Sequence, residues 1–223
     1  MDLNENKRII LALDVLNEKK AFDVLDNVHD LINAVKVNFP LILSCGIEIC
    51  IEIKKRYGLP IIGDFKIADV SITNNHIIDI SIDNKIDFLT VHGFIGKANL
   101  VKLKNHAKDK IQFFIITELT SCLGTILLPF EKNAELAVEL DFYGIQAPAT
   151  KPYIIKKLRK RVGSRLKIIS CGILAQGAAV GSAIRNGADF EIIGRGIYMM
   201  EDPRKATKEY IKHIEINTNY EFR

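Results

Sequence analysis

Eight short runs of β-forming residues recur along the 223-residue chain, with 23 to 30 residues between the ends of successive runs. Several runs are continuous in Ile, Leu, Val and Phe, which is typical of strands buried on both faces. A helix-like amphipathic stretch follows each of them. The runs are Arg8–Asp14, Ala34–Phe39, Pro60–Lys66, Phe88–Gly93, Gln112–Leu119, Tyr143–Ala149, Leu166–Gly172 and Phe190–Arg195.

This regular succession of βα units predicts a (β/α)8 TIM barrel, a fold of the α/β class. The alternative is an open Rossmann-type sheet, but no GxGxxG turn follows the first run. No stretch of the chain has the composition of a linker. We therefore expect a single barrel domain over residues 1–223, with a loose polar tail at about 217–223.

Two of the helical predictions are specific enough to check. Leu41–Arg56 carries a broad apolar stripe that includes Leu43 and Ile51, so we expect one helix there. Asp202 followed by Pro203 predicts the N-cap and the first turn of the last helix.

The composition narrows the class of protein. Lys and Arg total 31 against 27 Asp and Glu, a net charge of +4 that is spread along the chain. This excess is too weak to indicate nucleic-acid binding, although it suits an anionic small molecule. No apolar run approaches the ~20 residues of a membrane span, and the polar N-terminus lacks the layout of a secretory signal. Four cysteines without a CxxC pair indicate reduced thiols in a cytoplasmic protein.

Charged residues stand near the ends of the first three runs, where the chemistry of a barrel lies. Asp14 ends the first run, Lys36 lies in the second, and Asp64 and Lys66 end the third. Residues i and i+2 share a face of a strand, so Asp64 and Lys66 both point into the barrel mouth if Phe65 packs outward. Isolated charges there would be costly, and pairing offsets that cost. A structural ion-pair network is the alternative, but this convergence of charges is more typical of an active site.

The last two runs end in a pattern typical of phosphate binding. Cys171 and Gly172 end the seventh run, Gln176 follows before a helix, and Gly194 and Arg195 end the eighth. Barrels often bind phosphate in these two loops through backbone N–H groups, and an Arg can grip phosphate oxygens with two parallel hydrogen bonds. A turn with a solvated Arg is the alternative interpretation.

The sequence from Asp64 to Asp69 matches the DxKxxD motif of the orotidine 5′-phosphate decarboxylase family. DxKxxD alone defines a wider group of barrels, so the resemblance rests on a whole set of segments. They run in order, with family-like spacing, from about Arg8 to Pro203. The other segments that resemble the family are Leu11–Asp14, Val35–Val37, Thr73–Asn74, Val91–Phe94, Thr117–Leu119, Ala147–Pro152 and Ile193–Arg195.

The resemblance implies a cofactor-free, metal-free carboxy-lyase that converts orotidine 5′-phosphate to uridine 5′-phosphate and CO₂, the last step of de novo pyrimidine synthesis. It also implies a homodimer in which Asp69 and Thr73 reach into the partner's site. Lys36, Asp64, Lys66 and Asp69 match the family's charged catalytic array, with Lys66 as the proton donor. The implied substrate-binding residues are Asp14 at the ribose, Thr120 or Ser121 at the pyrimidine, Thr73, Pro148, and the phosphate-loop residues Cys171, Gly172, Gln176, Gly194 and Arg195.

Two residues depart from the family pattern in the phosphate loop: Cys171 stands where Pro is usual, and Leu174 replaces a Gly. The alternative function is a Mg-dependent sugar-phosphate decarboxylase or aldolase of the same barrel group, of the keto-gulonate-phosphate or hexulose-phosphate type. Those enzymes resemble each other in a strand-2 Glu that helps to hold Mg²⁺, where this chain has Lys36, and a cation there argues against that branch. A non-enzymatic phosphate-binding barrel would leave the complete charged array unexplained.

Overall fold

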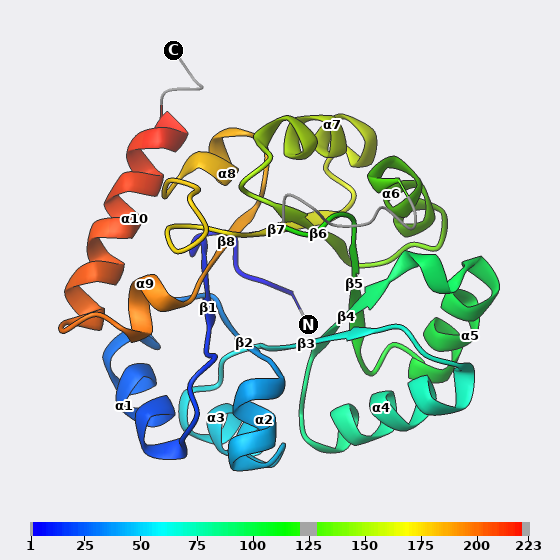
Figure 1. Cartoon of the computed structure of the whole chain (residues 1–223), viewed down its shortest axis with the longest axis horizontal. Helices are drawn as coiled ribbons and strands as arrows, with labels where there is room; N and C mark the ends of the chain where they lie inside the picture. Colours follow the sequence, from blue (N-terminus) through cyan, green and yellow to red (C-terminus); the bar gives the residue numbers. More distant parts are fainter. Residues whose placement is uncertain (1, 121–128, 220–223) are drawn as a thin grey trace.

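The computed structural model describes residues 2–120 and 129–219. Within them, eight parallel strands pair in chain order and close between β8 and β1 into a barrel (Figure 1). The predicted (β/α)8 fold is therefore confirmed, and each predicted run overlaps a strand, with β3 continuing one residue beyond its run. The strands are β1 (Ile9–Ala12), β2 (Ala34–Val37), β3 (Ile61–Ile67), β4 (Phe88–His92), β5 (Gln112–Ile116), β6 (Gly144–Pro148), β7 (Lys167–Cys171) and β8 (Phe190–Ile193).

Helices surround the barrel on its outside (Figure 1). Among the described residues, none of the helices has the length and apolar character needed to cross a bilayer. The helices are α1 (Glu18–Val28), α2 (Phe39–Cys45), α3 (Ile49–Tyr57), α4 (Ser71–Asp83), the 3₁₀ turn η1 (Gly93–Ile95), α5 (Lys97–Ala107), α6 (Phe130–Glu139), α7 (Pro152–Val162), α8 (Ser182–Arg185), α9 (Arg195–Tyr198) and α10 (Pro203–Asn219).

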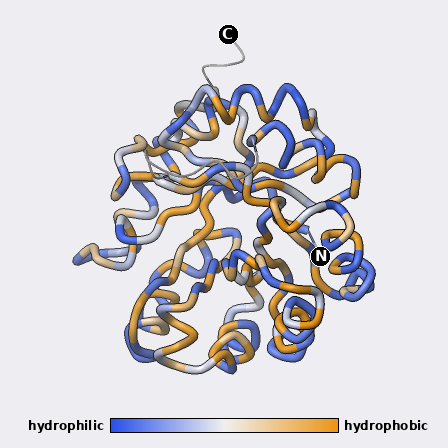
Figure 2. The backbone as a smooth tube through the Cα atoms, turned by 45° about the vertical axis from the view of Figure 1, so that its right-hand side comes forward, coloured by the Kyte–Doolittle hydropathy of each residue, from blue (hydrophilic) through white to orange (hydrophobic). Residues whose placement is uncertain are grey.

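Side chains alternate along each strand between two apolar cores. The larger core lies between the strands and the surrounding helices. The smaller one fills the interior of the barrel and includes Ile10, Phe88, Phe114 and Phe190. Figure 2 accordingly shows hydrophobic colour along the strands and a mixture of both colours along the helices. Large apolar side chains fill the part of the interior where the strands begin. The polar inward residues therefore gather near the C-terminal ends of the strands.

The prediction of a single helix over Leu41–Arg56 is wrong, because this segment forms two helices, α2 and α3. Gly46 follows α2 with a φ of 81°, and its N–H bonds to the carbonyl of Ile42 at 2.9 Å. A residue with positive φ cannot continue a right-handed helix, and glycine adopts this conformation without strain. Because the helix is interrupted, the predicted apolar stripe does not form one buried face: Leu43 is 83% exposed and Ile51 is 36% exposed.

Both ends of the last helix can be compared with the prediction. The Asp202 side chain accepts the backbone N–H of Lys205 at 2.8 Å, and α10 starts at Pro203, so the predicted N-cap is confirmed. At the other end α10 continues to Asn219. The first three residues of the expected loose tail are therefore helical, and 220–223 lie outside the described residues.

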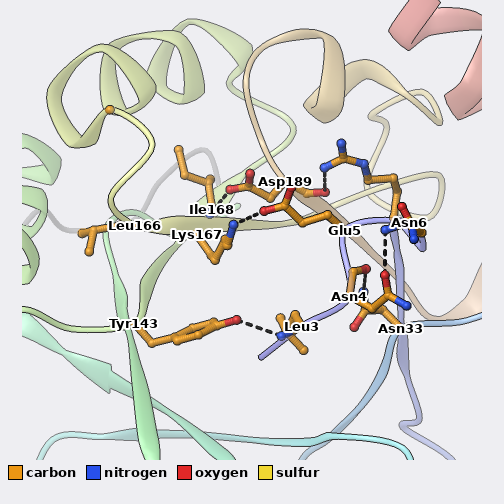
Figure 3. A network of polar contacts seen from close by, with 12 residues as sticks. Leu3, Asn4, Glu5, Asn6, Asn33, Tyr143, Leu166, Lys167, Ile168 and Asp189 are labelled. Atoms are coloured by element: carbon orange, nitrogen blue, oxygen red, sulfur yellow. Dashed lines mark hydrogen bonds and ion pairs between the residues drawn. The ribbon is translucent and has the colours of Figure 1, made fainter. Parts of the chain in front are cut away.

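The N-terminal segment closes the end of the barrel where the strands begin (Figure 3). The Leu3 side chain is buried in the interior core, and its N–H donates to the Tyr143 hydroxyl at 2.9 Å. The Asn33 amide donates to the carbonyls of Asn4 and Lys7, the latter at 2.7 Å. The open end of the barrel is therefore the opposite one, where the strands finish.

Candidate active site

A cavity opens at the C-terminal ends of the strands, and it collects most of the predicted site residues. It also contains residues that the sequence did not predict, including Asn38, Gln146 and Tyr198. The predicted residues that line it are Asp14, Lys36, Asp64, Lys66, Thr120, Cys171, Gly172, Gln176, Gly194 and Arg195.

A buried carboxylate stands at the centre of the charged array. Asp64 is 4% exposed. Its Oδ2 lies 2.8 Å from Lys36 Nζ, and its Oδ1 lies 2.8 Å from Lys66 Nζ. The Thr90 hydroxyl donates a third hydrogen bond to Oδ1 at 3.0 Å. One acid from β3 is thus held by an ammonium on β2, an ammonium on β3 and a hydroxyl on β4.

The end of β3 has an irregular backbone that sets these directions. The register with β4 shifts between Gly63 and Ile67, and Lys66 has a φ of 50°. Positive φ at a residue with a side chain costs roughly 1–2 kcal/mol. The Lys66 N–H donates to the Thr90 hydroxyl at 2.9 Å, which holds this conformation. Phe65 packs outward against Phe39, which meets the condition for Asp64 and Lys66 to point into the barrel mouth.

The electrostatics keep the buried pair charged. Burial alone would raise the pKa of Asp64, but the ammonium groups of Lys36 and Lys66 outweigh it and lower the pKa to about 2. Burial opposes the charge of Lys36, yet Asp64 and Asp14 outweigh burial and raise the pKa of its ammonium. Burial, with a further contribution from Asp64, raises the pKa of the Cys171 thiol to about 11, so this thiol is neutral at pH 7.

The loops after β7 and β8 form the rim of the cavity. Gly172 and Gly177 have φ values of 102° and 100°, and Leu174 has a φ of 57° where the family pattern has a Gly. The Arg195 side chain is exposed and lies 3.5 Å from the carbonyl of Ala175 in the neighbouring loop. The two loops thus lie together with a guanidinium at their edge, an arrangement that suits an anion.

Three predicted residues that the structure describes are not part of this cavity lining. Asp69 is exposed on the loop after β3, and Thr73 lies in the first turns of α4. Pro148 is buried at the end of β6. Ser121 lies outside the described residues.

Thr90 and Gln146 belong to the cavity region but were missed by the sequence analysis. Both are polar residues at inward positions of otherwise apolar strands, and this pattern is the signal that could have found them. In the described part of the chain, no three His, Cys, Asp or Glu side chains are grouped in a way that could hold a metal ion.

Known proteins resemble this chain over nearly its whole length. A family model described as "Orotidine 5'-phosphate decarboxylase / HUMPS family" matches residues 7–210. The orotidine 5′-phosphate decarboxylase of Pyrococcus furiosus is 36% identical over 209 residues, covering 93% of this chain and 97% of that protein. That of Methanosarcina mazei is 37% identical over 216 residues, covering 96% and 97%.

A solved structure has the same fold over nearly its whole length. The orotidine 5′-monophosphate decarboxylase from Methanocaldococcus jannaschii, complexed with the inhibitor BMP, superposes with a TM-score of 0.84. It is 32% identical, and the match covers 93% of this chain and 98% of that one. With a family model across most of its length and relatives aligned nearly end to end, this chain belongs to the orotidine 5′-phosphate decarboxylase / HUMPS family.

Proposed function

We propose that this protein decarboxylates orotidine 5′-phosphate to uridine 5′-phosphate and CO₂. The observation that carries the proposal is Asp64, held at 2.8 Å by both Lys36 and Lys66 at the mouth of the barrel. The relatives named above, which bear this activity in their names, support it. The array provides both a carboxylate and an ammonium at one point of the cavity, as loss of CO₂ from a pyrimidine requires.

In the proposed reaction the bond from C6 of the pyrimidine to its carboxylate breaks, and the electron pair stays on C6. Asp64 remains ionised and lies against the substrate carboxylate, which disfavours the ground state. The Lys66 ammonium stabilises the developing negative charge and then transfers a proton to C6. The neutral Lys66 amine regains a proton from solvent, so every atom is accounted for without a cofactor.

The phosphate grip is proposed for Gly172, Gln176, Gly194 and Arg195. These residues line the rim of the cavity, away from the Lys66 ammonium at its charged wall. Binding energy from such a remote group can be used to close the loops over the substrate and so raise the rate of the chemical step. Asp14 is proposed to bind the ribose, and its buried Oδ1 has no hydrogen-bond partner in the described structure.

We also propose a cytoplasmic homodimer in which Asp69 and Thr73 serve the partner's site. Asp69 is exposed beyond β3 and is not among the residues that line its own barrel's cavity. Next to it, Val70 is 63% exposed and Ile72 is 66% exposed. Large apolar side chains gathered beside a functional loop are typical of a subunit interface. Free thiols at three described cysteines support a reducing compartment.

The alternative is a Mg-dependent sugar-phosphate enzyme of the same barrel group. It requires a carboxylate ligand at the strand-2 position. Lys36 occupies this position with an ammonium 2.8 Å from Asp64, which neutralises the acid that Mg²⁺ would need and repels a second cation. The geometry therefore favours the decarboxylase.

Activity on orotidine 5′-phosphate in the presence of EDTA tests the function directly. We expect turnover to survive exhaustive chelation, and Lys66→Ala to reduce it below a few per cent while uridine 5′-phosphate still binds. Turnover that stops with EDTA and returns with Mg²⁺ would favour the sugar-phosphate enzyme. A fully active Lys66→Ala variant would show that Lys66 is not the proton donor.

A further inference from the structure

Gln146 occupies an unusual place for a polar side chain. It lies in the middle of β6 and is 3% exposed. Its neighbours Ile145 and Ala147 face the outer core, so the amide points into the barrel, where it lines the cavity. A ligand that enters the barrel mouth would therefore contact this side chain.

Among residues 2–120 and 129–219, the amide oxygen has no protein partner. Within that part of the chain Gln146 Oε1 is buried without a hydrogen bond, and Nε2 lies 3.6 Å from the sulfur of Cys171, which is a weak acceptor. By contrast, the polar groups on the opposite side of the cavity, at Lys36 and Asp64, are paired with each other. Buried polar atoms are rarely left unpaired, and an exception in a cavity wall indicates a ligand group that completes it.

The depth of Gln146 identifies the part of the ligand that it meets. In the register of β6 with β7, Gln146 pairs with Ile169, two residues before Cys171 and three before the phosphate-loop residue Gly172. Gln146 therefore lies deeper than the phosphate rim formed by Gln176 and Arg195. A nucleotide held at that rim by its phosphate places its base, the far end of the molecule, toward this depth.

We propose that the Gln146 amide contacts the pyrimidine ring of the nucleotide and contributes to its recognition. An amide offers a donor and an acceptor in one plane, which complements the adjacent C=O and N–H groups of a uracil-type ring. The sugar and the phosphate have no such edge. This inference rests on the proposed function, since it takes its ligand from that reaction.

The experiment compares two ligands that share a ribose phosphate but differ in the base. Gln146→Leu keeps the side chain's approximate size and removes both polar atoms. We expect it to weaken the affinity for uridine 5′-phosphate about ten-fold, as for one buried hydrogen bond, and to leave the affinity for ribose 5-phosphate within about two-fold. Isothermal titration calorimetry measures both without turnover.

Gln176→Leu is the matched control, because it makes the same change at the rim. It should weaken both ligands, since both carry the phosphate. The proposal is overturned if Gln146→Leu leaves uridine 5′-phosphate binding unchanged, or weakens both ligands equally. Should Gln146→Leu fail to fold, Gln146→Asn shortens the same amide and carries the same expectation. If the wild-type protein binds uridine 5′-phosphate but does not decarboxylate orotidine 5′-phosphate, the proposed function is refuted. The affinities of the variants for the two ligands can still be compared in that case.

Discussion

Thr90 connects the acid and the proposed proton donor of the site. Its hydroxyl donates to Asp64 Oδ1 at 3.0 Å and accepts the backbone N–H of Lys66 at 2.9 Å. Thr90 is fully buried in β4, and the residue that it supports has a left-handed backbone. It therefore acts as a positioning residue that fixes where the Lys66 ammonium stands relative to the substrate.

Replacing this hydroxyl tests its role. We expect Thr90→Val to lower kcat about ten-fold, because Asp64 loses a donor and the Lys66 N–H loses its acceptor. KM should change little, since the residues proposed to bind phosphate follow β7 and β8. Thr90→Ser retains the hydroxyl and should keep most of kcat in steady-state assays. A Ser variant that loses as much kcat as the Val variant would contradict this role, because Ser keeps the hydroxyl.

At the scale of elements, Glu191 joins β8 to the start of α8. It is fully buried and points outward, since Phe190 and Ile192 on either side face the barrel interior. Its two carboxylate oxygens accept the backbone N–H groups of Gly181 and Ala183, each at 2.8 Å. The segment between β7 and α8 also carries Gly172 and Gln176, which are proposed to bind phosphate, so Glu191 anchors the far end of that segment.

The protonation of Glu191 makes stability depend on pH. Burial raises its pKa above 4.5, although backbone N–H groups and Arg185 oppose the shift. Above pH 4.5 the unfolded chain has lost this proton while the folded chain still holds it. The free energy of unfolding therefore falls as pH rises from 4.5 through the raised pKa. We expect Glu191→Gln, which cannot ionise, to lack this fall.

Urea unfolding of both proteins at several pH values between 4.5 and 7.5 measures this difference. All other titratable groups are shared, so the difference between the two profiles isolates Glu191. The substitution also replaces one acceptor oxygen by an NH₂ group, at a cost of about 1–3 kcal/mol at low pH. Parallel profiles for the two proteins would show that Glu191 has the same pKa folded and unfolded.

At the scale of the whole molecule, an apolar face extends over the loop after β3 and helix α4. Val70, Ile72 and Ile80 are each at least half exposed, and Phe94 in η1 is 43% exposed. In the structure α4 packs beside α5, with the Ser71 hydroxyl 3.2 Å from the Asn99 amide oxygen. Asp69 stands at the edge of this face, so pairing two copies through it would bring each Asp69 toward the other chain.

Subunit mixing tests the proposed shared site. Asp69→Ala and Lys66→Ala chains should each be inactive alone. In a mixed dimer one site carries both lesions and the other carries neither. Random pairing makes half of the dimers mixed, each with one intact site of two, so roughly a quarter of full activity should return. Native mass spectrometry confirms the exchange. No recovery after confirmed exchange would place Asp69 in its own chain's site or outside catalysis.

Much of this barrel could be predicted because the information is local. The apolar runs recur at a regular interval, and their alternation indicates that Asp64 and Lys66 share a face while Phe65 packs outward. Strand ends meet at one edge of a barrel, so charged residues at three successive ends had to converge. For the same reason, the residues at the ends of the last two strands were predicted to lie around one cavity, and they do.

The chain's own order of residues thus determined the (β/α)8 fold, the position of the charged array and the capping of α10. The tertiary structure decided what depends on pairs distant in sequence. Thr90 meets Asp64 only because β4 pairs with β3 around a register shift, and the Gln146 amide oxygen lacks a partner among the described residues only because the barrel closes around it. A polar residue inside an apolar strand is equally compatible with either face until packing assigns one, since its hydrogen-bond partner comes from another strand.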